Sequence, residues 1–236
     1  AVGAITFSFI YWALGFLRMA TTGFTAQAIG SKNNDEIIAT AIRAFILAML
    51  LGLFIIVIQK TVVNTSLFLI NPDKNIKKIA EIYLSTRIYS APSNLIILAG
   101  MGWLLGQGLS KTILFIQLTT NLINIILSIT LGILYEMKVY GIALATVTAE
   151  IIGSILMILT FICIVKKDFS SLKTILSLNK IKLMLVSNLD IFIRTLCVIS
   201  AISMFTAIGA RIDNTILAAN AILVHMQSFI SHGLDG

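Results

Sequence analysis

Glu150 is the residue whose position most clearly suggests chemistry. It is the only acid well inside a long apolar stretch, Val139–Val165, and lies near the middle of that stretch. A charge at the centre of a bilayer costs about 2.5–3.5 kcal/mol on insertion scales, so an acid there needs an explanation. A protonatable carboxyl group at this depth could carry a proton, or bind a cation or a cationic substrate. The alternative is a neutral glutamate that hydrogen-bonds a neighbouring helix and serves packing only.

Arg18 is a second deep charge, within the apolar stretch Ala1–Gly30. On a helix, Arg18, Thr22, Thr25 and Ile29 would share one face. That face could line a cavity, with Arg18 and Thr22 as contacts for a substrate or ion. The alternative is a structural cation that pairs with an acid or extends its head group to the membrane surface.

A polar stripe runs along the charge-free stretch Thr112–Tyr135. Gln117, Asn121, Asn124 and Ser128 are spaced by four, three and four residues, which places them on one helix face. A polar stripe on an otherwise apolar helix faces other helices or a water-filled cavity. Two interpretations therefore stay open, hydrogen bonding between helices and the lining of a substrate cavity.

Three polar residues near the C-terminal end complete the candidate set. Asn220 belongs to the apolar stretch Asn214–Leu234, and we include it among the pathway candidates because that stretch is too polar to face lipid all round. Asp190 and Arg194 are four residues apart at the start of another apolar stretch. Side chains at this spacing meet on a helix, which predicts a structural ion pair.

Enzymatic chemistry has no visible basis in the sequence. The motifs H-E-x-x-H, G-x-S-x-G, Walker A and G-x-G-x-x-G do not occur. Cys163 and Cys197 lie in apolar runs without a neighbouring Cys/His cluster, which is typical of packing residues. We therefore expect no enzyme, no cofactor and no metal site.

The composition shows which kind of structure must position these residues. Hydrophobic residues make up 58% and charged residues 11% of the 236 residues. A soluble domain has about 45–50% apolar and about 25% charged residues, so this chain is expected in a membrane. The net charge of +7 comes from short basic patches between the apolar stretches. Basic residues of membrane proteins normally lie at the bilayer rims, so the expected partner is the lipid bilayer and not a nucleic acid.

The apolar stretches predict an all-α, polytopic transmembrane helix bundle. A helix needs about 20 residues to cross the hydrocarbon core. Seven stretches meet this length: 1–30 (with Arg18 inside), 37–58, 88–109, 112–135, 139–165, 191–210 and 214–234. Pro92 is expected to kink the third, and the pair Gly102 and Gly106 to allow another helix to approach closely.

Two longer connections, 59–78 and 166–189, join the predicted spans. In the second, five lysines alternate with leucine and isoleucine. This pattern predicts an amphipathic helix on the membrane surface, and the alternative is a solvated basic loop. The lysine and arginine counts on the two sides are nearly equal, and the side with 166–189 is the better cytoplasmic candidate.

Four stretches resemble the multidrug and toxic compound extrusion family, and within it the DNA-damage-inducible F branch. They are GFLRMATTGFTAQAIG (15–30), RIYSAPSNLIILAGMGWLLGQ (87–107), GIALATVTAE (141–150) and residues 190–236. The resemblance implies twelve transmembrane helices in two six-helix lobes. Residues 1–165 would then be family helices two to six of the first lobe, 166–189 the basic linker between the lobes, and 190–236 helices seven and eight at the start of the second lobe. The expected chain is thus an incomplete transporter.

The resemblance also implies a function. Members exchange a cation, a proton or sodium, for a small organic or xenobiotic compound, so we expect an antiporter in a bacterial inner membrane. The acid that many members carry in their first helix has no counterpart here. A flippase of lipid-linked precursors, from the wider exporter superfamily, is the first alternative. It would need a strongly cationic cavity, and Arg18 is the only arginine expected to lie deep. A truncated fragment that transports nothing is the second.

Overall fold

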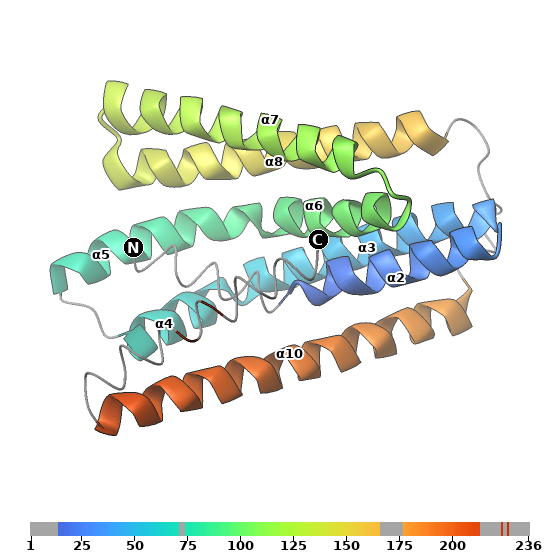
Figure 1. The fold of residues 1–236 in the computed structure, drawn as a ribbon. Helices are drawn as coiled ribbons and strands as arrows, with labels where there is room; N and C mark the ends of the chain where they lie inside the picture. Colours follow the sequence, from blue (N-terminus) through green and yellow to red (C-terminus); the bar gives the residue numbers. More distant parts are fainter. Residues whose placement is uncertain (1–13, 71–73, 166–176, 213–222, 224–225, 227–236) are drawn as a thin grey trace. The chain divides into compact units, whose positions relative to one another are not determined.

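The computed structural model describes residues 14–70, 74–165 and 177–212, together with 223 and 226. All secondary structure in these residues is helical (Figure 1). The helices are α2 (Phe16–Gly30), α3 (Asn34–Val57), α4 (Gln59–Ile70), α5 (Lys74–Arg87), α6 (Ala91–Gly106), α7 (Ser110–Ile129), α8 (Lys138–Val165) and α10 (Leu178–Ile212). The predicted all-α fold is confirmed.

Four helical segments in the described part of the chain are long and apolar enough to cross a membrane. They are Asn34–Val57, Lys77–Gly106, Ser110–Leu134 and Lys138–Val165. These match the second to fifth predicted spans. The first predicted span begins outside the described residues, the sixth lies within α10, and nearly all of the seventh lies outside the described residues.

Residues 58–76 lie between the second and third spans, close to the predicted connection 59–78, and most of the described residues there are helical. Only Ile58 separates α3 from α4, and the third span begins at Lys77 instead of Ile88. Pro92 does not end this helix. It occupies the first turn of α6, where a missing N–H costs no hydrogen bond, and a 3₁₀ turn, Ile88–Ser90, joins α5 to α6.

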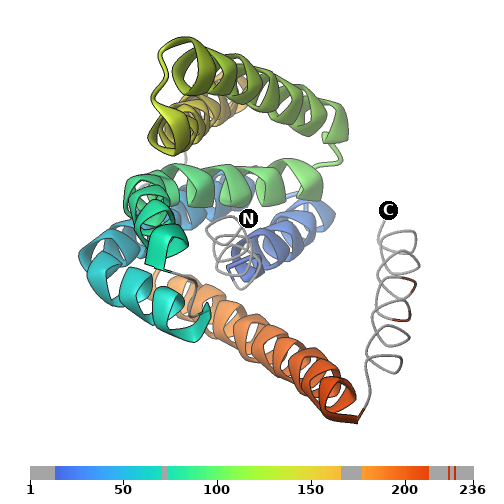
Figure 2. The same ribbon diagram turned by 90° about the vertical axis from the view of Figure 1, so that its left-hand side faces the viewer.

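Helix α6 lies at the centre of the first part of the chain. It contacts α2, α3 and α8, and in Figure 2 it runs between the α2/α3 pair and the α7/α8 pair. Trp103 and Leu104 of α6 are fully buried, and Phe161 of α8 packs edge-on against Trp103 with 5.2 Å between ring centroids. The indole N–H of Trp103 donates to the carbonyl of Ile37 on α3, at 3.0 Å. This core fixes α6 against both of its neighbouring helix pairs.

Two glycines allow α2 to pack directly on α6. A Cβ atom on Gly102 would collide with the carbonyl oxygen of Arg18, and one on Gly106 would lie 2.7 Å from the Cβ atom of Thr25. The predicted close approach at this G-x-x-x-G pair is therefore confirmed. Because α2 carries the candidates Arg18 and Thr22, these glycines position them relative to α6.

Helix α7 is the least covered of the spans. Only 6% of its most apolar segment is buried, and Leu118, Leu122 and Ile125 are among its exposed side chains. It contacts mainly α8 and the π-helical turn Thr130–Leu134 that follows it. An apolar helix exposed in this way is suited to face lipid.

The described chain divides into two units, residues 1–191 and 192–236, and the boundary falls inside α10. Residues 166–176 of the predicted linker lie outside the described residues, whereas its end, from Leu178, is the first part of α10. The predicted domain limits at 165/166 and 189/190 stay predictions.

Candidate functional site

Glu150 connects α8 to the helical segment formed by α5 and α6. Only 8% of the residue is exposed. Its Oε1 atom accepts hydrogen bonds from the amide of Asn94 on α6, at 3.2 Å, and from the guanidinium of Arg87 at the end of α5, at 3.4 Å. Arg87 and Asn94 are two helical turns apart, so the continuous helical path through the 3₁₀ turn places both on one face.

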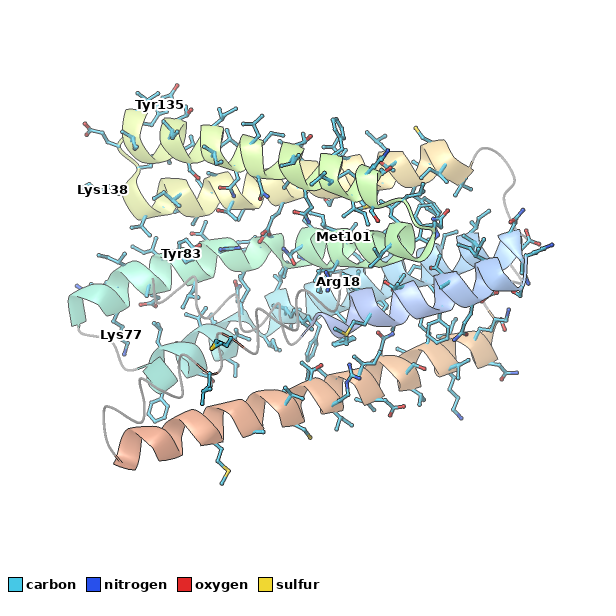
Figure 3. All side chains as sticks on the ribbon, viewed as in Figure 1. Arg18, Lys77, Tyr83, Met101, Tyr135 and Lys138 are labelled. Atoms are coloured by element: carbon cyan, nitrogen blue, oxygen red, sulfur yellow. The ribbon has the colours of Figure 1, made fainter. Side chains whose placement is uncertain are left out.

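Arg87 is held by a second partner. Its guanidinium donates to the hydroxyl of Tyr83 at 2.7 Å and lies 5.8 Å from the centre of that ring. The side chains of Arg87 and Glu150 are only 18% and 10% exposed. Figure 3 labels Tyr83 on this helical segment. We call Tyr83, Arg87, Asn94 and Glu150 the Glu150 cluster.

The Glu150 cluster can exist in two charge states. With an ionised carboxylate, Glu150 compensates the charge of Arg87, and buried ion pairs depend strongly on such compensation. When the carboxyl group is protonated, the ion pair is lost and a net positive charge stays on Arg87. Uptake of one proton thus changes the connection between α8 and the α5–α6 segment. The sequence offered a working acid or a neutral packing residue, and the structure shows an acid paired with an arginine.

An open polar cavity lies beside this region. Its volume is about 640 Å³, and it is lined from α4, α5, the 3₁₀ turn and α8. Its polar lining includes Asn64, Glu81, Thr86, Tyr89 and Tyr140. Thr86, which lines this cavity, directly precedes Arg87 in the chain.

Arg18 and Thr22 are not joined to the Glu150 cluster by any described hydrogen bond. Arg18 is exposed, and Figure 3 shows it on α2. The hydroxyl of Thr22 donates to the backbone carbonyl of Arg18 at 2.9 Å, while Thr25 is buried against Gly106. The predicted face of α2 is therefore divided: Thr25 serves packing on α6, and a cavity role for Arg18 and Thr22 stays a prediction.

The residues of the polar stripe on α7 do not share one role. The amide of Gln117 donates to the sulfur of Met101 on α6 at 3.0 Å, as expected of a contact between helices. Asn121 is exposed, and Asn124 accepts from the hydroxyl of Ser128 at 3.2 Å within the same helix. No described bond links this stripe to the Glu150 cluster.

The remaining candidates lie near or beyond the end of the described chain. Asp190 and Arg194 are exposed on α10 and belong to different units, so their predicted ion pair stays a prediction. Asn220 lies outside the described residues. In the part of the chain that the structure describes, no group of three His, Cys, Asp or Glu side chains could hold a metal ion.

Sequence reasoning missed Tyr83, Arg87 and Asn94. The expected third span begins at residue 88, so it leaves Arg87 just outside the membrane-spanning segment. The spacing from Arg87 to Asn94 is the signal that could have identified both, since seven residues return to the same helix face. Arg43 was also overlooked as a deep arginine, although only 6% of it is exposed.

The sequence matches known proteins over its full length. The MatE family model matches residues 1–130. The chain is 34% identical over 239 residues to a protein of Escherichia coli (strain K12) named DNA damage-inducible protein F, in a match that covers 100% of this chain and 52% of that protein. The chain thus spans about half the length of this curated relative.

Solved structures show the same fold. The outward-facing conformation of a multidrug resistance MATE family transporter of the MOP superfamily has a TM-score of 0.80 at 19% identity, and the match covers 99% of this chain and 52% of that chain. A MOP superfamily transporter from Pyrococcus furiosus Vc1 has a TM-score of 0.78 at 18% identity, with 96% and 52% covered. The chain therefore has the fold of these transporters over about half of their length.

Proposed function

This chain belongs to the MatE family of membrane transporters, and on that premise we propose that it serves a cation-coupled antiporter that exports small organic compounds. It is an integral, multi-pass membrane protein. The observation that carries the coupling part of the proposal is the buried ion pair between Glu150 and Arg87. Titratable groups inside a membrane are costly and usually mark ion or substrate pathways.

The proposed coupling step uses the two charge states of the Glu150 cluster. A proton that enters from one side neutralises Glu150 and releases Arg87 from the ion pair. Loss of the proton to the other side restores the pair. Because α8 and the α5–α6 segment are connected through this contact, each change of charge favours a different arrangement of these helices. Sodium is the alternative coupling ion, since a carboxylate and an amide oxygen are suitable ligands for a hard cation.

The cargo in this proposal is a small organic compound that is moved without chemical change. A flippase of lipid-linked precursors would need uncompensated cations for a pyrophosphate group. Two deep arginines are instead paired with acids, Arg43 with Glu36 at 2.7 Å and Arg87 with Glu150 at 3.4 Å. This arrangement favours an organic compound over a pyrophosphate. We propose a bacterial inner membrane as the location, with the α10 start on the cytoplasmic side.

The test is the substitution Glu150→Gln in the natural full-length form of the protein. Glutamine keeps the size of the side chain and can still accept from Asn94, but it cannot titrate. We expect the pH dependence of export to be lost, together with most of the export rate. The measurement is efflux of a fluorescent organic cation from proteoliposomes, with an imposed proton or sodium gradient, at matched amounts of reconstituted protein.

Glu136→Gln is the matched control, because Glu136 is an exposed acid in the turn between α7 and α8. It should leave the pH profile unchanged. Absence of gradient-driven efflux by the unsubstituted protein would contradict the proposed function itself. Efflux by the unsubstituted protein with an identical pH profile for Glu150→Gln would contradict only the role of Glu150.

A further inference from the structure

A second charged network joins α3 to the first half of α10, away from the Glu150 cluster. Glu36 accepts from Arg43 at 2.7 Å through one carboxylate oxygen and from the ammonium of Lys180 at 2.6 Å through the other. Asn33 caps the same end of α3 by accepting from the backbone N–H of Glu36 at 3.0 Å. One acid and two bases give this network a net charge of +1.

The network forms part of the wall of a polar cavity. The cavity has a volume of about 330 Å³, and Gln27, Ser31, Asn33 and Thr40 line it together with the three charged residues. The side chain of Lys180 is 45% exposed, whereas the side chain of Arg43 is 5% exposed. An ammonium group has three donors, so Lys180 can bind an anion on its open side while it keeps its bond to Glu36.

A second, apolar pocket lies next to the polar cavity. A pocket of about 190 Å³ shares Arg43 and Met184 with the polar cavity. Its other lining side chains are all aliphatic: Ile46, Leu47 and Leu50 from α3, and Ile181 and Leu185 from α10. We call the two pockets together the α3–α10 groove. It is polar and cationic at one end and purely aliphatic at the other.

The direction of the groove follows the depth of the membrane. Asn33 and Glu36 lie at the start of a span whose mean hydropathy reaches 2.5, so this end is at the membrane surface. Leu50 lies fourteen residues further along α3 than Glu36, which is about 21 Å at 1.5 Å per residue. Half of a bilayer core is about 15 Å thick. The aliphatic end of the groove therefore lies within the hydrocarbon layer.

From these observations we propose that the α3–α10 groove binds one anionic phospholipid of the phosphatidylglycerol type. The phosphate lies against Lys180 at the polar end, and an acyl chain fills the pocket formed by Ile46, Leu47, Leu50, Ile181 and Leu185. The network charge of +1 complements the single negative charge of this lipid. A free phosphate would leave the aliphatic end empty, and a peptide would bring unpaired backbone groups into the hydrocarbon layer.

The bound lipid would connect two helices that are far apart in the chain. Lys180 belongs to α10 and Leu50 to α3, so a lipid in the groove contacts both and adds to the contact that Glu36 makes with Lys180. An anionic lipid is therefore expected to raise the thermal stability of the protein. A lipid of the same chain length without net charge should have a smaller effect, because it does not complement the network.

The experiment compares two substitutions that affect opposite ends of the groove. Lys180→Gln removes the exposed ammonium group, and Leu50→Trp fills the aliphatic end without changing any charge. The natural full-length protein is purified in mild detergent and titrated with phosphatidylglycerol or phosphatidylethanolamine, and bound lipid is counted by native mass spectrometry. We expect each substitution to lower phosphatidylglycerol occupancy about tenfold, the loss typical of one charge-assisted contact or one well-filled apolar site.

The control substitutions change exposed side chains on another helix, α7. Lys111→Gln removes an exposed lysine at the start of α7, and Leu118→Trp changes a side chain that is 60% exposed, as Leu50 is. Neither should change occupancy. The proposal is overturned if Lys180→Gln and Lys111→Gln retain equal lipid, or if phosphatidylethanolamine binds as well as phosphatidylglycerol. It is also overturned if inorganic phosphate alone removes the lipid, or if Leu50→Trp binds the lipid normally.

Discussion

Glu150 and Arg87 show how the cost of a charge in a membrane is met by one specific partner. Glu150 alone would be an uncompensated acid near the middle of α8. Arg87 and Asn94 bring two donor groups on one helix face to within hydrogen-bond distance of this acid, through contacts at 3.4 and 3.2 Å. Arg87 therefore compensates the charge of Glu150, and the two hydrogen bonds fix the orientation of the carboxylate. The ion pair connects α8 to the end of α5 while Glu150 is ionised.

We predict that Arg87→Gln destabilises the protein more than Glu150→Gln does. Removing Arg87 leaves a carboxylate that is only 10% exposed without its counter-ion, at a cost of about 3–5 kcal/mol. Removing the charge of Glu150 leaves an arginine that is still bonded to Tyr83. The double substitution should recover part of the loss. Urea unfolding of the three variants in detergent gives the coupling free energy. Additive effects within about 0.3–0.5 kcal/mol would show that the two side chains do not interact.

At the scale of helices, the packing of α2 on α6 depends on the absence of side chains at two positions. Gly102 and Gly106 are one turn apart, and each faces the backbone or a threonine of α2. Gly23 of α2 differs, because a methyl group added there would meet no atom within 4 Å. Close packing of the two helices therefore requires glycine at positions 102 and 106, whereas position 23 has space for an alanine.

We predict that Gly102→Ala destabilises the protein, because the new methyl group would meet the backbone carbonyl of Arg18, which cannot rotate away. The two helices would have to separate, and overpacking of this kind costs about 1–3 kcal/mol. Gly23→Ala is the control, and it should stabilise α2 by up to about 1 kcal/mol through helix propensity. Thermal unfolding measurements show whether each substitution raises or lowers the stability of the protein. A stabilising Gly102→Ala would contradict the close approach.

At the scale of the molecule, the described elements of the first unit alternate between two ends. Figure 1 places the α2–α3 turn, the α6–α7 turn and the start of α10 at one end, and the α7–α8 turn and the start of α5 at the other. Lys32, Lys111 and Lys180 belong to the first end, and Lys138 to the second. Successive predicted spans must start at opposite membrane surfaces, and the positions of these turns agree with that requirement.

We predict that the end with Lys111 is cytoplasmic and the end with Glu136 is external. The test needs a background without reactive thiols, so the exposed Cys163 and Cys197 are first changed to serine. Lys111→Cys should react with a membrane-impermeant maleimide only after the cells are opened. Glu136→Cys should react in intact cells. The reverse pattern would contradict the orientation, and labelling of both in intact cells would contradict the alternation of ends.

The sequence by itself determined the class of the protein and most of its spans. Composition and the lengths of the apolar stretches are local properties, and in a bilayer they decide the fold class, because backbone groups in lipid must be satisfied within helices. The pair Gly102 and Gly106 was also readable, since close approach needs only small residues one turn apart. Glu150 was recognisable as a costly acid for the same local reason.

Only the tertiary structure decided what these residues contact. The partners of Glu150 come from positions far from it in the chain, and no spacing rule within α8 could identify Arg87 or Asn94. The third span continues past Pro92 through a 3₁₀ turn, and the turn residues Ile88 and Ser90 are buried against other parts of the chain. The contact between Glu36 and Lys180 likewise joins helices that are far apart in the described chain. Contacts of this kind depend on how helices pack in three dimensions, and that packing is set by many side chains together.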